Sequence, residues 1–255
     1  MKPCLLIPNY DHGATMPELV KGLEPYGLPL IVVDDGSAEP TRRVLESLAA
    51  SHSWIELHRR ATNGGRGAAL RDGYRHAARA GYTHALQLDA DGQHAAVDVP
   101  RMLEAAAAQP DALVLGRPLF DDSAPRSRLQ ARKLSQGLVW LETLSFAIRD
   151  PLCGFRCFPL EATVALLAER ELGDHMEFDP EIVVRLLWRG LPVVNVPTRV
   201  VYHQGGLSHY QNVRDTVRIA GAHARLLAGM LPRSPRLVAR WFRRTPGARK
   251  EGAGR

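Results

Sequence analysis

Short apolar segments alternate with longer stretches of helical periodicity through the first half of the chain. Segments rich in apolar residues and bounded by turn residues predict buried strands at 4–7, 30–33, 55–58, 85–88 and 112–115. The stretches between them predict helices at 16–23, 39–51, 67–80 and 97–109. This alternation is typical of an α/β fold with a mostly parallel sheet and helices on both faces.

Polar clusters follow three of the predicted strands, at residues 8–11, 34–37 and 89–91. Ligands of such sheets bind beyond the carboxyl ends of the strands. Independent acidic turns would not need to share one edge of a sheet. The repeated position of these clusters therefore indicates a binding site at that edge.

Asp89 and Asp91 leave the end of a predicted buried strand together, and Gly92 then allows a sharp turn. Residues two apart on a strand point the same way, so both carboxylates can converge on one cation while Ala90 points away. With Gln93 they form an oxygen-only set that suits Mg2+ or Mn2+, which keep positions open for phosphate oxygens. The pattern predicts a site for a nucleotide diphosphate. The alternative is a plain acidic turn that caps the next helix.

A glycine-rich loop at 63–67 precedes the third predicted helix. Its glycines, Gly65 among them, permit close approach of a ligand to the backbone, the helix start offers free N–H groups, and Arg66 offers a cation. The loop therefore fits a phosphate-bearing ligand, and a merely flexible loop is the alternative. It is a poor dinucleotide fingerprint, because the third glycine is missing and the loop does not follow the first strand.

Several motifs in a fixed order resemble the family 2 glycosyltransferases of GT-A fold. In the first half they are Ile7-Pro8-Asn9-Tyr10, Val33-Asp34-Asp35-Gly36-Ser37, Asn63-Gly64-Gly65-Arg66-Gly67-Ala68 and Asp89-Ala90-Asp91-Gly92-Gln93-His94. In the second half they are Gly116-Arg117, Arg132-Lys133, Asp150-Pro151-Leu152-Cys153-Gly154-Phe155-Arg156 and Phe178-Asp179-Pro180-Glu181. The likeness covers about residues 4–210 and is strongest to the dolichyl- or polyprenyl-phosphate sugar synthases.

The resemblance implies an inverting, metal-dependent transfer of a sugar from a UDP- or GDP-linked donor by single displacement. With the loop and the first polar cluster, the expected nucleotide-binding residues are Pro8, Tyr10, Asp11, Asp35, Gly65, Arg66 and Asp89. The expected metal ligands are Asp89, Asp91 and Gln93, and the expected catalytic residues are Asp91, Arg117 and Arg132. The two arginines would face the acceptor.

The expected acceptor is a polyprenyl phosphate, because an ionised phosphate can attack without a general base. The alternative is a hydroxylated lipid or another acyl-chain acceptor, for which Asp150, Glu177 and Asp179 are the candidate bases. His209, in the segment 205–209, stands where the resembled group tends to have a lysine, which leaves the alternative open. The signature of processive polysaccharide synthases is missing, so polymer synthesis is disfavoured.

Charge is distributed unevenly over the 255 residues. The net charge is +6, and residues 225–255, with eight arginines and Lys250 against Glu251, carry +8, which leaves −2 for the rest. Apolar residues interleave with these arginines: Leu226, Leu227, Met230, Leu231, Leu237, Val238, Trp241 and Phe242. The mixture predicts either an amphipathic segment on a membrane surface or a helix packed on the body with a solvated arginine face.

We therefore expect a glycosyltransferase domain at 1–210, an amphipathic helical extension at 211–246 and a disordered tail at 247–255. The start at Met1 has no signal-peptide pattern, and no apolar run approaches the ~20 residues of a spanning helix. The expected location is the cytoplasmic face of a membrane, with peripheral attachment. The three cysteines match no complete zinc pattern, which favours reduced thiols.

Other classes of protein fit the pattern less well. A haloacid dehalogenase-type phosphatase would carry its DxDG motif on the first strand, and here Asp34 and Asp35 come earlier. A sugar nucleotidyltransferase would need a glycine- and arginine-rich loop directly after the first strand. A basic-tailed nucleic-acid binder would need a reading module, which the body lacks. We expect no nucleic-acid partner.

Overall fold

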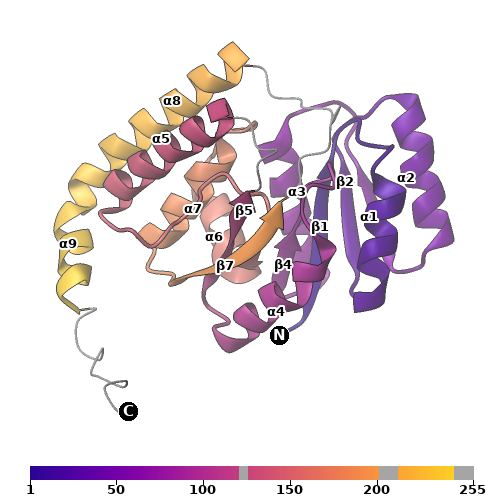
Figure 1. Ribbon diagram of the computed structural model, residues 1–255, viewed down its shortest axis with the longest axis horizontal. Coiled ribbons are helices and arrows are strands. Elements are labelled where there is room, and N and C mark those ends of the chain that lie inside the picture. The colour runs from indigo at the N-terminus through magenta and orange to yellow at the C-terminus, as the bar shows by residue number, and fades with distance from the viewer. Residues whose placement is uncertain (121–125, 201–211, 244–255) are drawn as a thin grey trace.

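The computed structural model describes residues 1–120, 126–200 and 212–243 and builds them around one twisted sheet (Figure 1). The strands of this described part follow the order β3-β2-β1-β4-β6-β5-β7. Their bounds are β1 Pro3–Asn9, β2 Leu30–Asp34, β3 Ile55–Arg59, β4 His84–Gln87, β5 Leu113–Phe120, β6 Arg156–Pro159 and β7 Val193–Val200. Only β6 runs antiparallel to its two neighbours, β4 and β5. The expected mostly parallel sheet is confirmed.

The helices are α1 Met16–Leu23, α2 Glu39–Ser51, α3 Arg66–Arg79, α4 Val99–Ala108, α5 Arg126–Thr143, α6 Leu160–Glu169, α7 Phe178–Trp188, α8 Asn212–Met230 and α9 Ser234–Arg243. Short 3-10 turns lie at η1 Glu24–Tyr26, η2 Ala96–Asp98 and η3 Leu231–Arg233. The predicted helices 16–23 and 39–51 have the observed bounds, and 67–80 and 97–109 differ from α3 and α4 by one or two residues at each end. The predicted strand at 112–115 continues to Phe120 as β5.

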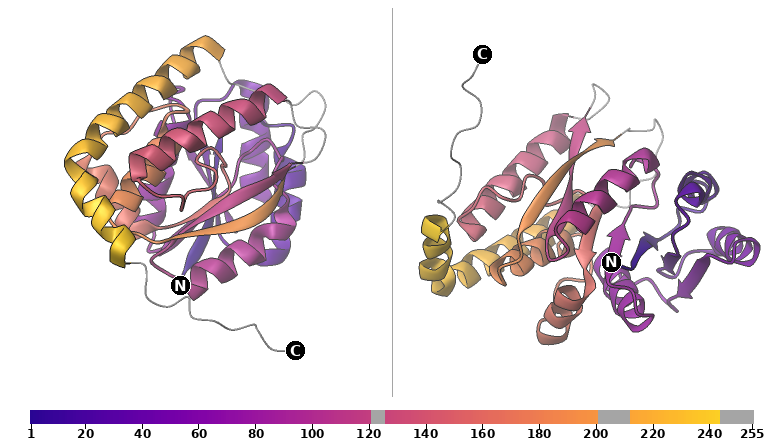
Figure 2. Two further views of the ribbon diagram at one scale, coloured as in Figure 1. Left: turned by 60° about the vertical axis from the view of Figure 1, so that its left-hand side comes forward. Right: turned by 90° about the horizontal axis from the view of Figure 1, so that it is seen from below.

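Two hydrophobic cores lie on opposite faces of the sheet (Figure 2). Successive strand residues point to opposite faces, so Leu5 packs in one core and Leu6 in the other, and both are fully buried. Apolar residues of α1, α2 and α4 complete the core around Leu5. Residues of α3, α6 and α7 complete the core around Leu6. Both faces are therefore covered, as the alternating pattern predicts.

The parallel strands bring the predicted polar clusters to one edge of the sheet. Asn9 at the end of β1 pairs in register with Asp34 at the end of β2, and β4 lies on the other side of β1. The segments after β1, β2 and β4 therefore leave the sheet at the same edge. Because β5 runs parallel to β4 in the same sheet, Arg117 and Phe120 lie toward that edge as well.

Helix α8 packs on the body beside α5 and α7 (Figure 1), and Arg240 of α9 donates hydrogen bonds to the Leu187 and Trp188 carbonyls at the end of α7. Leu226 of α8 and Leu237 of α9 are buried, whereas Leu231 and Val238 are exposed. Pro232 lies in η3 and Pro235 at the start of α9, so the prolines divide the segment as expected. In the part of the chain that the structure covers, no helix has the length and apolar character needed to cross a bilayer.

Some expectations concern segments outside the described residues. These are the segment 205–209 with His209, the tail 247–255, the domain boundary at 210 and the side chains of Trp241 and Phe242. The divisions at 210 and 246 remain predictions.

Candidate active site

The turn after β4 places two carboxylates at the edge of the sheet. Burial alternates along this turn. Leu88 and Ala90 are buried, whereas Asp89 and Asp91 are partly exposed. The chain turns at Gly92, which has a φ of 70°, a value that glycine adopts without strain. The Asp91 Oδ1 atom accepts a hydrogen bond from the backbone N–H of Gln93 at 3.0 Å. The backbone thus fixes Asp91 within the turn.

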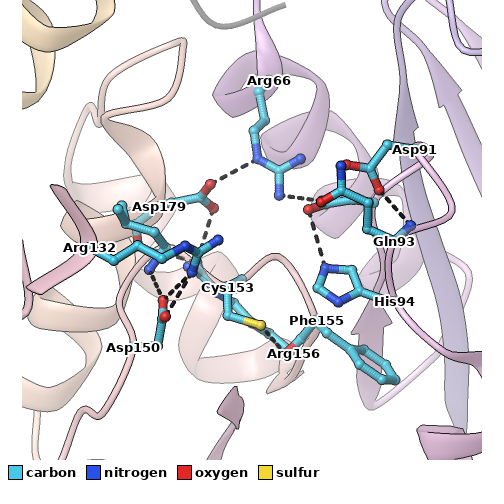
Figure 3. Close-up of polar contacts among 12 residues, drawn as sticks. Arg66, Asp91, Gln93, His94, Arg132, Asp150, Cys153, Phe155, Arg156 and Asp179 are labelled. Atoms are coloured by element: carbon cyan, nitrogen blue, oxygen red, sulfur yellow. Dashed lines mark hydrogen bonds and ion pairs between the residues drawn. The ribbon is translucent and has the colours of Figure 1, made fainter. Parts of the chain in front are cut away.

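Arg66 lies between two carboxylates that come from distant parts of the chain (Figure 3). Its Nη2 atom is 2.6 Å from Asp89 Oδ1, and its Nε donates a hydrogen bond to Asp179 Oδ2 at 2.9 Å. Burial opposes the guanidinium charge, but Asp179 and Asp89 outweigh it and raise the pKa of Arg66. Arg66 therefore remains a cation at the start of α3, as the expected phosphate-binding role requires.

The two carboxylates of the turn differ in their electrostatic surroundings. Burial opposes ionisation of Asp89, but Arg66 and His94 outweigh it and hold its pKa below the ordinary value. Burial and the nearby charge of Asp89 raise the pKa of Asp91, and the N–H of Gln93 only partly opposes them. Asp91 has no arginine or lysine ion-pair partner among the described residues. Asp89 therefore has a guanidinium partner, whereas Asp91 relies on the backbone N–H of Gln93.

His94 and Gly154 pack against Asp89. His94 Nε2 lies 3.4 Å from Asp89 Oδ2, and its ring centre lies 5.4 Å from that of Phe155. The His94 Nδ1 atom is buried without a hydrogen-bond partner in the described structure. Gly154 leaves room for the Asp89 carboxylate, which a Cβ at that position would overlap. Both residues stand in motifs of the sequence, but the sequence predicts no role for them.

Arg156 is the buried centre of the adjoining loop and is 1% exposed. It donates to Asp179 Oδ1 at 3.0 Å and to the backbone carbonyls of Pro151 at 2.6 Å and Cys153 at 2.5 Å. A buried arginine is stable only when such partners satisfy its donors. Arg156 thus fixes both Asp179 and the loop that carries Gly154.

The expected nucleotide-binding carboxylate Asp35 lies at the end of β2 and is 2% exposed. It accepts hydrogen bonds from the backbone N–H groups of Gly64 at 3.0 Å and Gly65 at 2.7 Å, and it pairs with Arg60. A carboxylate has about four acceptor positions, so these three bonds leave one position unused. The structure thereby joins the second polar cluster to the glycine-rich loop.

The first polar cluster is held to the start of α2. Asp11 Oδ1 accepts from the Ala38 N–H at 2.8 Å, and the Asp11 N–H donates to Ser37 Oγ at 2.9 Å. The Asp11 carboxylate therefore orders this loop in the free protein. Pro8 is buried in β1 beside Val33, and Tyr10 is partly exposed just beyond the strand.

The glycine-rich loop packs against residues 173–178. A Cβ on Gly65 would overlap the His175 ring, and one on Gly67 would overlap the Gly173 carbonyl and Phe178. Gly65 also has a φ of 97°, so it is required by both space and backbone conformation. The loop is therefore firmly packed, which argues against the flexible-loop alternative.

The two arginines expected at the acceptor lie on β5 and α5. Arg117 is exposed on β5. Arg132 on α5 contacts both oxygens of Asp150, at 2.9 and 2.7 Å, and its guanidinium carbon lies 5.3 Å from the ring centre of Phe120, at the end of β5. Arg132 is thus brought to the strand that carries Arg117.

The candidate bases are all engaged with other groups. Asp150 pairs with Arg132, and Asp179 pairs with Arg66 and Arg156. Glu177 is buried, and its Oε1 accepts from the backbone N–H of His175 at 3.4 Å. None of the three is a solvated carboxylate that faces a substrate freely.

The donor set at the turn after β4 suits a divalent cation only in part. Within the described ranges, no group of three or more His, Cys, Asp or Glu residues could hold a metal by itself. Asp89 Oδ1 is buried and contacts Arg66 Nη2 at 2.6 Å in an ion pair that lacks hydrogen-bond alignment, and Asp91 lies in the same turn. Two neighbouring carboxylates suit Mg2+ or Mn2+ that shares its remaining ligands with diphosphate oxygens, and in this structure Arg66 holds one of them, Asp89.

The chain is similar to several known proteins. The model of the family described as glycosyl transferase family 2 matches residues 4–162. The polyprenol monophosphomannose synthase of Mycolicibacterium smegmatis is 27% identical over 222 residues, which cover 84% of this chain and 83% of that protein. The undecaprenyl-phosphate mannosyltransferase of Micrococcus luteus is 25% identical over 217 residues, which cover 82% of this chain and 87% of that protein.

A solved structure shows the same fold. It is glucosyl-3-phosphoglycerate synthase from Mycobacterium tuberculosis in complex with Mn2+, UDP and glucosyl-3-phosphoglycerate. The TM-score is 0.63 at 18% sequence identity, with 91% of this chain and 79% of that chain covered. The expected GT-A type of fold is confirmed.

Proposed function

Because the chain belongs to glycosyl transferase family 2, we propose that it moves a sugar from a nucleotide donor to a polyprenyl phosphate, with inversion at the anomeric carbon and with Mg2+ or Mn2+. The names of the relatives from Mycolicibacterium smegmatis and Micrococcus luteus support the polyprenyl acceptor. The Mn2+ and UDP of the similar solved structure support a metal-bound nucleotide donor.

One observation carries the donor half of this proposal. Asp89 and Asp91 follow one strand together, and Asp89 Oδ1 is buried against the guanidinium of Arg66 at 2.6 Å. Paired carboxylates next to a cation are suited to a metal diphosphate. A divalent cation bound to Asp89, Asp91 and Gln93 would neutralise the charge that develops on the departing diphosphate.

The remaining donor residues would bind and orient the nucleotide. Pro8, Tyr10 and Asp11 line the end of β1, and Asp35 lies at the end of the neighbouring β2. Asp35 would accept a hydrogen bond from an N–H of the base. Because uracil and guanine both offer such a donor, the proposal includes UDP- and GDP-sugars.

The acceptor half depends on Arg117 and Arg132. A guanidinium group can hold phosphate oxygens with two parallel hydrogen bonds. Arg132 would exchange Asp150 for the acceptor phosphate, since the two anions are alternative partners for the same group. An ionised phosphate oxygen then attacks without prior removal of a proton.

The alternative acceptor is a hydroxylated lipid, which needs a base within ~3 Å of its proton. Asp150, Glu177 and Asp179 are the nearest candidates by sequence, and each is engaged by arginines or by backbone. Ion pairing with arginine disfavours proton uptake by a carboxylate. We therefore favour the phosphate.

The test has two stages. A thermal-shift screen with Mn2+ and nucleoside diphosphates or their sugars identifies the donor, because a ligand of the native state raises stability by mass action. The purified protein is then given that donor with a polyprenyl phosphate or with the matched polyprenol. Transfer to the phosphate is expected, with the product anomer opposite to that of the donor. Transfer to the polyprenol alone would refute the proposed acceptor.

We also propose that the C-terminal segment contacts the cytoplasmic face of a membrane. Leu231 and Val238 are 66% and 46% exposed, beside a strongly basic sequence. Apolar residues flanked by arginines suit an anionic lipid interface. The doubly substituted Leu231→Gln/Val238→Gln protein should sediment less with anionic vesicles at low salt. Val97→Gln, which changes a residue that is 65% exposed near α4, is the control. Equal sedimentation of all three proteins would contradict this part.

A further inference from the structure

The two contacts of Arg66 differ in kind. Its Nε bond to Asp179 is an aligned hydrogen bond of 2.9 Å. Its Nη2 atom lies 2.6 Å from Asp89 Oδ1, yet that oxygen has no aligned hydrogen-bond donor. The strength of a hydrogen bond falls steeply with poor alignment. Arg66 is therefore bound to Asp179 by a directional hydrogen bond and to Asp89 mainly by charge attraction.

The Asp179 end of this bridge is fixed. Asp179 is 5% exposed, and Arg156 donates to its Oδ1 at 3.0 Å and to its backbone carbonyl at 3.2 Å. Arg156 is itself held by two loop carbonyls. Asp179 thus stays in place whether or not Arg66 contacts Asp89.

The Asp89 end is where an incoming cation would compete. Arg66 already contacts Asp89, the carboxylate that a divalent ion would also bind. Two like charges on one carboxylate repel each other, so binding of the ion weakens the hold of Asp89 on the guanidinium. A diphosphate offers the displaced guanidinium a new anionic partner.

We propose that Arg66 occupies Asp89 in the donor-free protein, competes there with the divalent cation, and turns about Asp179 onto the diphosphate when donor and metal arrive together. The inference rests on the proposed donor site and adds that the metal and the nucleotide bind there together rather than the metal first. Metal alone binds weakly because Arg66 must give up Asp89 without compensation. Metal with a nucleoside diphosphate binds tightly because Arg66 gains the phosphates.

The experiment measures binding of Mn2+ to the full chain by electron paramagnetic resonance, without any sugar or acceptor. In the absence of nucleotide, Arg66→Gln should bind Mn2+ about tenfold more tightly than wild type, which corresponds to about 1.4 kcal/mol. Arg75→Gln removes the same charge from the same helix, where Arg75 bonds the Leu167 carbonyl, and should bind Mn2+ like wild type. The affinity of Arg66→Lys for Mn2+ should lie between those of wild type and Arg66→Gln. A lysine ammonium cannot bridge Asp89 and Asp179 as the guanidinium of Arg66 does.

Addition of UDP or GDP separates the two proposals. Wild type should then bind Mn2+ much more tightly, and Arg66→Gln should lose most of this gain. Suppose that nucleotide tightens Mn2+ binding in wild type, but that without nucleotide Arg66→Gln and wild type bind Mn2+ with equal affinity. The competition is then refuted and the donor site stands. If neither nucleotide tightens Mn2+ binding to wild type, and Asp91→Asn behaves like wild type, the donor site and the competition both fail.

Discussion

Gly154 lies against the carboxylate of Asp89, so closely that a Cβ at position 154 would overlap both carboxylate oxygens. The reason for glycine here is space, since Gly154 is not among the residues with positive φ. Arg156, two residues later, fixes the backbone of this loop through the Cys153 carbonyl. The loop therefore cannot withdraw easily, and an added methyl group must displace Asp89.

We expect Gly154→Ala to weaken binding of Mn2+ with UDP or GDP at least about tenfold, because the added methyl group would displace the carboxylate of Asp89, a proposed metal ligand. Transfer should fall with it. The measurement is a titration of the variant with nucleotide and Mn2+, followed by tryptophan fluorescence or calorimetry.

Gly137→Ala is the matched control for this substitution. Gly137 lies on α5, and a Cβ added there would have no atom within 4 Å, so the methyl group of alanine meets open space. Alanine in a helix interior is about 1 kcal/mol more favourable than glycine, so this variant should be slightly stabilised and should bind nucleotide normally. Normal binding by both variants would show that Asp89 does not serve the donor.

A separate prediction concerns Asp91. Asp91→Asn should reduce transfer strongly and abolish the Mn2+-dependent part of nucleotide binding, because one of the two proposed carboxylate ligands of the metal is removed. The fold should remain intact, since Asp91 is partly exposed and its substitution disturbs no core. Circular dichroism and the melting temperature check the fold, and turnover with saturating Mn2+ checks the function. Near-normal turnover would contradict the metal assignment.

The first half of the fold could be predicted because its signals are local. In α1 and α2 a proline stands in the first turn and apolar residues repeat at helical spacing, so the sequence predicts both helices with their bounds. The same reasoning does not predict the strand β6. It is four residues long and begins with Arg156, which a sequence pattern would place at the surface. The burial of Arg156 depends on its partner Asp179, which lies 23 residues away along the chain.

The site shows the same limit. Asp89 and Asp91 could be predicted as a pair because they are neighbours in sequence and leave one strand together. The contact of Arg66 with Asp179 joins residues 113 positions apart, and no periodicity encodes such a pair. Gly154 is visible in the sequence only as part of a motif, because the need for glycine arises from the Asp89 carboxylate, which follows β4.

The acceptor arginines give a further prediction. Arg132→Gln should raise the KM for polyprenyl phosphate without weakening Mn2+-nucleotide binding, because Arg132 lies on α5 with Asp150 and makes no described contact to Asp89 or Asp91. Arg132→Lys should recover only part of the loss, since lysine lacks the planar fork. Arg101→Gln, on the exposed side of α4, is the control for loss of one positive charge. An unchanged acceptor KM in Arg132→Gln would remove this residue from the acceptor site.

The last prediction concerns a buried acid outside the proposed site. Glu142 on α5 is fully buried, and its Oε1 lies 2.7 Å from Nδ1 of His223 on α8. Burial raises the pKa of Glu142 above its ordinary value of 4.5, Glu181 adds to the rise, and His223 opposes it. The folded protein therefore holds this proton more tightly than the unfolded chain.

The stability that this proton provides is complete below pH 4.5 and is lost as the pH rises through the raised pKa. Glu142→Gln removes the titration and keeps an oxygen that can accept from His223. The free energy of unfolding of wild type, relative to this variant, should therefore decrease as the pH rises from about 4 to about 7. Urea unfolding at several pH values measures the difference. The exposed Glu104→Gln substitution on α4 should give a nearly flat difference over the same range. A flat difference for Glu142→Gln as well would show that the contact with His223 offsets the burial of this carboxylate.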